Sequence, residues 1–417
     1  MINLNEIIKY LQENTHDFQI IIGDSDNVVL QLNDNQLKSS KSTSTKVYEI
    51  TVYVEHNSKI KRATQSFTNP SIDLIKMLID IAKASEALDY FYGLPKKKDY
   101  DKASFDKNII NVDKVKDHLD IIRDKCKGLK IADSKVAVSL ANINLITSQG
   151  IDSEYKSSSY SSYVSLVNGS DAFEDISFGR FAKDKEVEQM CDNVIKKYGD
   201  FKNAVKLKNN KIPVILKPDV INSLMNYAYI PNLFATNIEH KRSFLSFDDI
   251  GKELTKTKLS LIDNPFMKDA SSEAFDYEGN KAYRKQIIDQ GIFKTPLTNF
   301  NISKKYDLIN TASASSVNSV AFSNIELQGN DSEYKDAVII ESVLGAHTSN
   351  TITTDFSVSV DKAYLIEDSK KIPVKDFFIS GKMKNVLNNA LFTDKQEFRG
   401  DILTKSILSE DISIIIE

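Results

Sequence analysis

The segment Leu344-Gly345-Ala346-His347-Thr348-Ser349-Asn350-Thr351-Ile352-Thr353-Thr354-Asp355-Phe356-Ser357-Val358 lies among several short stretches of strand-like sequence. Its second half, rich in β-branched and apolar residues, predicts a strand over residues 351–360. Neighbouring strands are predicted over residues 336–342, 363–367 and 371–379. The segment therefore belongs to a strand-rich region, and its first half predicts a turn between two strands.

Predicted strands predominate from residue 211 onward, whereas the N-terminal half mixes helices with strands. Alternation of apolar and polar residues predicts antiparallel strands at 48–54, 135–147 and 160–167. Apolar residues at helical spacing predict amphipathic helices at 71–90, 112–127 and 187–198. The predicted fold class is α+β. It has an N-terminal mixed domain over residues 1–205, with helices on a largely antiparallel sheet, and a β-rich C-terminal domain over residues 206–417.

Composition excludes several classes of protein. The formal net charge of -4 over 417 residues is dispersed along the chain, which argues against a nucleic-acid partner. No apolar run reaches the roughly 18 to 20 residues that a membrane helix needs, so no membrane partner is expected. Cys126 and Cys191 have no metal-ligand spacing and are expected to be reduced thiols in a cytoplasmic protein.

The segment 344–358 resembles the signature of the TldD/PmbA family of peptide-processing metalloproteases, in which Gly-x-His-Thr-x-Asn precedes Asp-Phe-Ser. Upstream, Leu261-Ile262-Asp263-Asn264-Pro265 and Phe275-Asp276-Tyr277-Glu278-Gly279 are similar to two further blocks of that family, in the same order. Where the family usually has a Gly-Asn-rich loop, residues 310–316 read Asn-Thr-Ala-Ser-Ala-Ser-Ser, without the conformational freedom of glycine.

The resemblance implies a heteromeric zinc protease. Its catalytic subunits carry His-Glu-x-x-x-His, in which the two imidazoles bind zinc and the carboxylate activates water. Counted back from Ser243-Phe244-Leu245, this motif is expected near residues 226–231, which read Asn-Tyr-Ala-Tyr-Ile-Pro and contain no histidine. The chain thus resembles the TldE/PmbA-type subunit, with no catalytic residue, metal ligand or cofactor of its own. Zinc is expected in a TldD-type catalytic partner, and the substrate would be an extended or unfolded peptide.

Candidates for the substrate cleft or the subunit interface are the polar residues of the signature segment: His347, Thr348, Asn350, Asp355 and Ser357. For His347 a hydrogen-bonded turn is an equal alternative, and for Asp355 a structural role is favoured. Asp276 and Glu278 either place two carboxylates together, as acid and base catalysis requires, or form a polar turn.

Two other functions remain open. A self-sufficient peptidase with an unrecognised site would be active and bind metal alone. A peptide-binding or regulatory homodimer would bind peptide without cleaving it.

Overall fold

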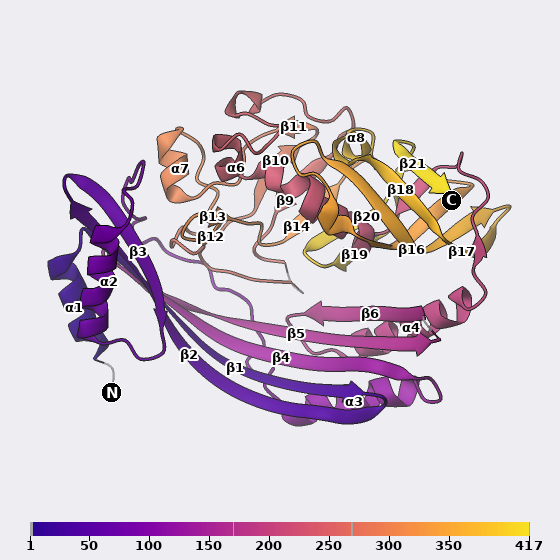
Figure 1. Ribbon diagram of the computed structural model, residues 1–417, viewed down its shortest axis with the longest axis horizontal. Helices are drawn as coiled ribbons and strands as arrows, with labels where there is room; N and C mark the ends of the chain where they lie inside the picture. Colours follow the sequence, from indigo (N-terminus) through magenta and orange to yellow (C-terminus); the bar gives the residue numbers. More distant parts are fainter. Residues whose placement is uncertain (1–2, 170, 268–269, 417) are drawn as a thin grey trace.

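The computed structural model describes residues 3–169, 171–267 and 270–416, and confirms the α+β fold class. Strands β1 to β6 form one antiparallel sheet in the order β3-β2-β1-β4-β5-β6. In Figure 1 the long strands β1, β2, β4 and β5 curve beneath the C-terminal half of the chain. Their bounds are β1 Asp17–Asn33, β2 Gln36–His56, β3 Lys59–Phe67, β4 Ile131–Thr147, β5 Asp152–Asn168 and β6 Asp171–Gly179.

Helices pack at both ends of this sheet. Near one end, α1 (Leu4–Asn14) and α2 (Ile72–Ala84) bury Leu11 and Leu78 in one apolar cluster with Ile20 of β1. At the other end, α3 (Val112–Lys125) and α4 (Asp184–Phe201) share a second cluster with β4 and β5. Burial of these apolar stripes, at about 25 cal/mol per Å², stabilises the helices on the sheet.

The helix predicted over residues 71–90 begins as expected but ends earlier. The Ser71 hydroxyl accepts a hydrogen bond from the amide of Leu74 and caps the first turn. At the other end, the Ser85 hydroxyl donates to the carbonyl oxygens of Ala82 and Arg62, at 2.8 and 3.0 Å. This bond to β3 directs the chain away from the helix at Ser85.

The C-terminal half contains a larger mixed sheet, ordered β11-β10-β9-β14-β20-β8-β15-β16-β17-β7, with β18 pairing β16 and β21, and β19 pairing β20. The strand bounds are β7 Val205–Lys206, β8 Val214–Leu216, β9 Ser260–Asp263, β10 Lys285–Asp289, β11 Ile292–Phe293, β14 Ile325–Gln328, β15 Ala337–Leu344, β16 Asp355–Glu367, β17 Lys370–Lys375, β18 Phe377–Lys382, β19 Leu391–Arg399, β20 Ile402–Ser409 and β21 Ile412–Ile416. The small hairpin is β12 Ala314–Ser316 and β13 Ser319–Val320. The short helices are α5 Pro218–Leu224, α6 Ala235–Glu239, α7 Phe300–Lys305 and α8 Met383–Asn388.

Three strand predictions in this half are corrected. The strand predicted over 351–360 begins only at Asp355, because Asn350 closes a turn by accepting the amide of Thr353, and Thr354 has a positive φ of 61°. It then continues as β16 to Glu367, so the predicted strand at 363–367 is not separate. The strand predicted over 371–379 is split into β17 and β18 at Asp376, where φ is 63°.

The two halves share buried side chains. Ile215 of β8, Ile339 of β15 and Tyr364 of β16 lie in the same apolar cluster as the buried faces of α3 and α4. The Tyr364 hydroxyl also donates to Oδ2 of Asp200 at 2.6 Å. A domain boundary near residue 205 stays a prediction. In the part of the chain that the structure describes, no helix combines the length and apolar composition that a membrane span requires.

Candidate functional site

The signature segment forms an exposed connection between β15 and β16. Gly345 adopts φ +89°, a left-handed conformation that glycine reaches without steric cost. A short 3-10 turn, η4 (Ala346–Thr348), follows, and the Thr348 hydroxyl donates to the carbonyl oxygen of Gly345 at 2.8 Å. The side chains of Thr348 and Asn350 therefore both stabilise turns.

The remaining predicted residues lie farther along the same surface. Asp355 and Lys382 form an ion pair at 3.0 Å between half-exposed side chains. A hydrogen bond from Thr353, followed by Lys382, lowers the pKa of Asp355 below its usual value. Ser357 is exposed and lies opposite Ser380 of β18. Asp355 thus takes part in a surface pair, which is consistent with the structural role favoured for it.

His347 is the one predicted candidate that faces the segment where a zinc motif is expected. Its ring lies 6.4 Å from that of Tyr227, edge to face. Tyr227 belongs to η1 (Met225–Tyr229), a turn of π-helix that continues α5 and leads into the 3-10 turn η2 (Ile230–Leu233). The structure therefore brings two separately identified segments, 226–231 and 344–358, into contact.

Pro231 explains the change of helix type. Proline has no amide hydrogen, and its ring collides with the carbonyl four residues earlier, so an α-helix cannot continue through it. The released carbonyl of Tyr227 accepts a hydrogen bond from the Thr351 hydroxyl at 2.9 Å. π-helical turns of this kind are frequent at functional sites.

Asn232 connects the segment 225–233 by hydrogen bonds to residues 243–244 and to Thr351. Its buried side-chain amide donates to the carbonyl oxygen of Thr351 at 2.6 Å and accepts the amide of Phe244 at 3.0 Å. The Ser243 hydroxyl donates to the Asn232 carbonyl at 2.9 Å. Residues 225–233, 243–245 and 345–355 therefore form one hydrogen-bonded unit, here called the signature cluster.

The signature cluster offers no metal site. The side chains of residues 226–231 are amide, phenol and apolar groups, which lack the imidazoles and carboxylates that zinc takes in proteins. Among the described residues, no group of three or more His, Cys, Asp or Glu side chains could hold a metal ion. The residues present do not fit a zinc ion, and no chemical step is derived through one in this chain.

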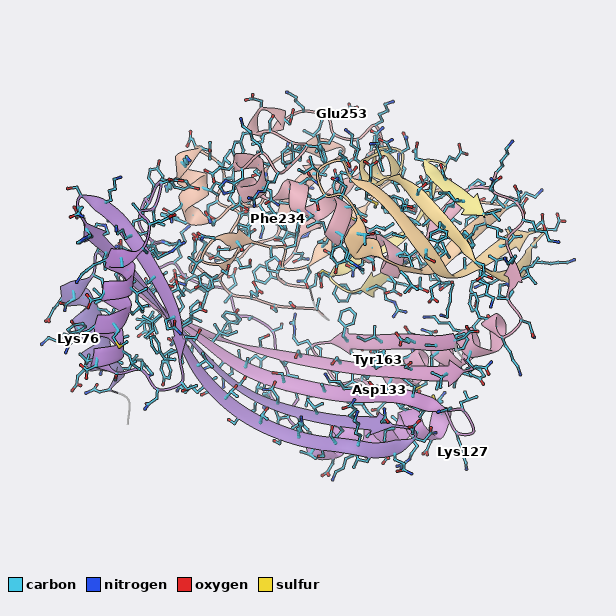
Figure 2. The ribbon with its side chains drawn as sticks, viewed as in Figure 1. Lys76, Lys127, Asp133, Tyr163, Phe234 and Glu253 are labelled. Carbon is cyan, nitrogen blue, oxygen red and sulfur yellow. The ribbon has the colours of Figure 1, made fainter. Side chains whose placement is uncertain are left out.

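A second region lies between the two halves. The sequence predicted no cavity there, although it singled out Asp276 as a possible acid or base. Figure 2 shows side chains of both halves projecting into the space between them. A cavity of about 250 Å³ lies there, here called the acidic cavity. The N-terminal sheet contributes apolar and aromatic residues, and the C-terminal half contributes three carboxylates with small and aromatic residues. Its lining includes Ile21, Ile143, Leu145, Tyr155, Asp263, Pro265, Glu273, Phe275, Asp276, Tyr277, Ala282, Ala312, Ala314, Phe322 and Ser323.

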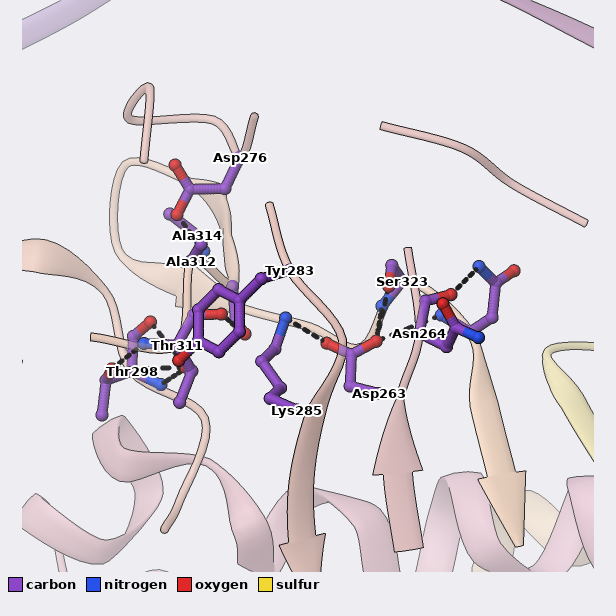
Figure 3. Close-up of polar contacts among 12 residues, drawn as sticks. Asp263, Asn264, Asp276, Tyr283, Lys285, Thr298, Thr311, Ala312, Ala314 and Ser323 are labelled. Atoms are coloured by element: carbon purple, nitrogen blue, oxygen red, sulfur yellow. Dashed lines mark hydrogen bonds and ion pairs between the residues drawn. The ribbon is translucent and has the colours of Figure 1, made fainter. Parts of the chain in front are cut away.

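Asp263, at the end of β9, is fully paired. Figure 3 shows its two oxygens in use: Lys285 Nζ lies 2.7 Å from Oδ2, and the Ser323 amide donates to Oδ1 at 2.9 Å. Both side chains of the ion pair are almost entirely buried, at 4% exposure for Lys285 and 1% for Asp263. The Lys285 ammonium and the Asp263 carboxylate therefore compensate each other inside the protein.

Asp276 is surrounded by donors. Its Oδ1 accepts the amides of Glu278 and Asn280, and its Oδ2 accepts the amide of Ala314 at 3.1 Å. Burial nevertheless raises its pKa, and burial followed by the charge of Asp276 raises the pKa of Glu278 to about 8. Glu278 accepts the first amide of α7, from Phe300, at 2.7 Å. The two carboxylates are close together, and both organise a turn.

Glu273 differs from these carboxylates. Its side chain has no hydrogen bond or ion pair with the described residues, although it lines the cavity. Burial, followed by the charges of Asp263 and Asp276, raises its pKa to about 7. Desolvation disfavours an unpaired carboxylate, which accounts for the direction of this change.

The loop 310–316, whose geometry the sequence left open, forms one wall of the cavity. Ala312 adopts φ +48°, in the left-handed region that side chains with a Cβ rarely occupy. The Asn310 side chain holds the loop by accepting the Ala312 amide at 2.9 Å and donating to Asn280 at 2.7 Å. Local hydrogen bonds therefore maintain a conformation that glycine would adopt more easily.

Comparison with known proteins identifies related sequences. Residues 209–415 match the PmbA/TldA metallopeptidase C-terminal domain. An uncharacterised protein of Methanocaldococcus jannaschii is 24% identical over 76% of this chain and 78% of its own length. A metalloprotease PmbA homolog of Haemophilus influenzae is 27% identical over 64% of this chain and 61% of its own length.

The fold as a whole also has a solved counterpart. The crystal structure of TldE from Thermococcus kodakarensis superposes with a TM-score of 0.84, covering 99% of both chains at 19% sequence identity. That likeness concerns the fold, and the family model and curated relatives supply the sequence evidence. The chain belongs to the TldD/PmbA family.

Proposed function

We propose that this chain is a non-catalytic, TldE/PmbA-type subunit that pairs with a TldD-type zinc-bearing subunit and helps to enclose extended peptides. The signature cluster is the main support. At the position where the catalytic subunits carry their zinc motif, this chain has Pro231, a π-helical turn and side chains that cannot ligate zinc. Activation of water by a metal is assigned to the partner subunit.

The exposed side of the signature cluster supports an interface next to the partner's site. Tyr227 and Ile352 of the signature cluster are 48% and 46% exposed, and Leu344, directly before it, is 60% exposed. Aromatic and apolar residues of this kind are enriched at protein interfaces. Under this proposal His347 and Tyr227 contact the partner or the peptide.

The C-terminal sheet supports binding of an extended substrate. In the described residues β21 pairs with no strand except β18, which leaves backbone donors and acceptors along its other edge. A peptide can add to such an edge as a further strand, held by main-chain hydrogen bonds. The proposed substrate class is therefore the extended or unfolded peptide.

Co-expression with a TldD-type subunit tests the proposal. We expect a stable complex, measured by light scattering, that cleaves unfolded peptides while this chain alone does not. Tyr227→Ala should weaken the complex without lowering the melting temperature, and Tyr92→Ala, at a 53% exposed tyrosine outside the signature cluster, is the matched control. Cleavage by this chain alone would favour a self-sufficient peptidase. Peptide binding without cleavage, even in the presence of the partner, would favour a regulatory homodimer.

A further inference from the structure

The acidic cavity has the composition of a site for a cation with an apolar stem. Ile21, Leu145 and Tyr155 of the N-terminal sheet form one wall, and Phe275 and Phe322 contribute from the C-terminal half. The rings of Tyr155 and Phe275 meet edge to face with centroids 4.9 Å apart. Long aliphatic stems bury against such surfaces, and aromatic faces attract ammonium and guanidinium groups.

The carboxylates of the cavity are not equivalent. Asp263 is neutralised by Lys285, and Asp276 is occupied by backbone and amide donors. Glu273 alone has no partner in the part of the chain that the structure describes, yet it lines the same space. Glu273 is partly buried, and a carboxylate that loses water without gaining a partner costs free energy unless a cation or a proton compensates it.

We propose that the acidic cavity binds one cationic group of an extended peptide, a lysine or arginine side chain or the amino terminus, with Glu273 as the counter-ion. This inference rests on the proposed function, because it specifies where and by which chemistry the peptide is recognised. The aromatic and apolar wall contacts the stem of the cationic residue, and the Glu273 carboxylate accepts hydrogen bonds from its head. A cavity of about 250 Å³ accommodates a single long side chain.

The site is sensitive to pH in a defined direction. The titratable groups around Glu273 are Asp263 of β9, Lys285 of β10, Asp276 of the following loop and the phenol of Tyr155 on β5. Because Glu273 has a pKa of about 7, it is largely protonated at pH 6 and largely ionised at pH 8. Binding of a cation therefore strengthens as pH rises through this range.

The test uses the full chain and three labelled peptides that differ at one feature. One is N-acetylated and contains a central lysine, the second replaces that lysine with norleucine, and the third has norleucine with a free amino terminus. We expect a cationic peptide to bind about tenfold more tightly than the acetylated norleucine peptide at pH 8, with a smaller difference at pH 6. The peptide that binds more tightly than the acetylated norleucine peptide identifies which cationic group is bound.

Two variants connect this gain to the cavity. Glu273→Gln should abolish the difference between the peptides and its pH dependence. Glu253→Gln, at an exposed glutamate, should retain both. Thermal denaturation controls for folding of each variant.

Equal affinity for charged and uncharged peptides would overturn the inference, as would a preference that persists in Glu273→Gln. If those peptides are still cleaved by the complex with the partner, the proposed function stands without the cation site. If no peptide binds and none is cleaved, the proposed function itself fails.

Discussion

The signature cluster and the acidic cavity use polar residues in opposite ways. In the signature cluster the recognisable residues are exposed, and their side chains close turns or form surface pairs such as Asp355 with Lys382. In the acidic cavity the carboxylates of Asp263 and Asp276 are buried, and Asp263 and Lys285 compensate each other inside the protein. A sequence signature thus marks where the chain turns and contacts others, whereas the most perturbed electrostatics lie elsewhere.

The largest effect should come from breaking the buried ion pair. Asp263→Ala leaves the Lys285 ammonium buried without a counter-charge, and we expect a loss of about 3–5 kcal/mol in the free energy of unfolding. Lys382→Ala removes the pair with Asp355 at the surface and should cost much less, because water screens an exposed pair. Chemical denaturation of both variants measures the contrast, and equal losses would contradict it.

The next effect concerns the hydrogen-bonded centre of the signature cluster. Asn232→Ala leaves the Phe244 amide and the Thr351 carbonyl without their partner, so we expect a loss of about 2–3 kcal/mol. Asn350→Ala, in the exposed turn of the same cluster, should cost about 1 kcal/mol or less. A small loss in Asn232→Ala would mean that the three segments are held together by other contacts.

The third prediction concerns the contribution of Glu273 to the free energy of unfolding, which should decrease as pH rises, the opposite of the usual behaviour of a carboxylate. Its pKa is raised from 4.5 to about 7, so the folded state binds more protons than the unfolded state between these values. Its contribution to the free energy of unfolding therefore falls as pH rises from about 4.5 to 7. We expect Glu273→Gln to gain about 1–3 kcal/mol relative to the natural chain between pH 5 and 8. A stability difference between the two proteins that is the same at pH 5 and at pH 8 would argue against an unpaired carboxylate with a raised pKa at Glu273.

The smallest effect is expected at the strained wall of the cavity. Ala312→Gly relieves the steric cost of φ +48° but increases the entropy of the unfolded chain. We expect the steric relief to exceed the entropic cost, which gives a net stabilisation of about 0.5 kcal/mol that is measurable as a higher melting temperature. Ala314→Gly, at a neighbouring position without a positive φ, should be destabilising.

The sequence predicted those parts of the fold that depend on local pattern. The stripe of Ile75, Leu78 and Ile79 identified α2, and alternation through residues 48–54 identified the part of β2 that pairs with β1 and β3. Strand ends were wrong where single residues with positive φ, Thr354 and Asp376, interrupt an apolar run. The C-terminal strands β19 to β21 received no assignment.

The acidic cavity could not be predicted because its residues are distant in sequence. Tyr155 and Glu273 are separated by more than a hundred residues, and no periodicity links them. One available signal was a carboxylate, Asp263, directly after the apolar residues Leu261 and Ile262. The contacts of His118 could not be predicted from the sequence either; the structure buries it between Tyr160 and Asp184, at 2.7 Å from each. Such contacts depend on tertiary packing.

Zinc content and peptide turnover of the separately purified chain test the central claim most directly. The signature cluster has a proline and a π-helical turn where its relatives' zinc motif is expected, so the chain alone should contain no stoichiometric zinc and cleave no unfolded peptide. Both zinc and turnover should appear when a TldD-type subunit is added. Stoichiometric zinc in the chain alone, with peptide cleavage that a chelator abolishes, would contradict this account.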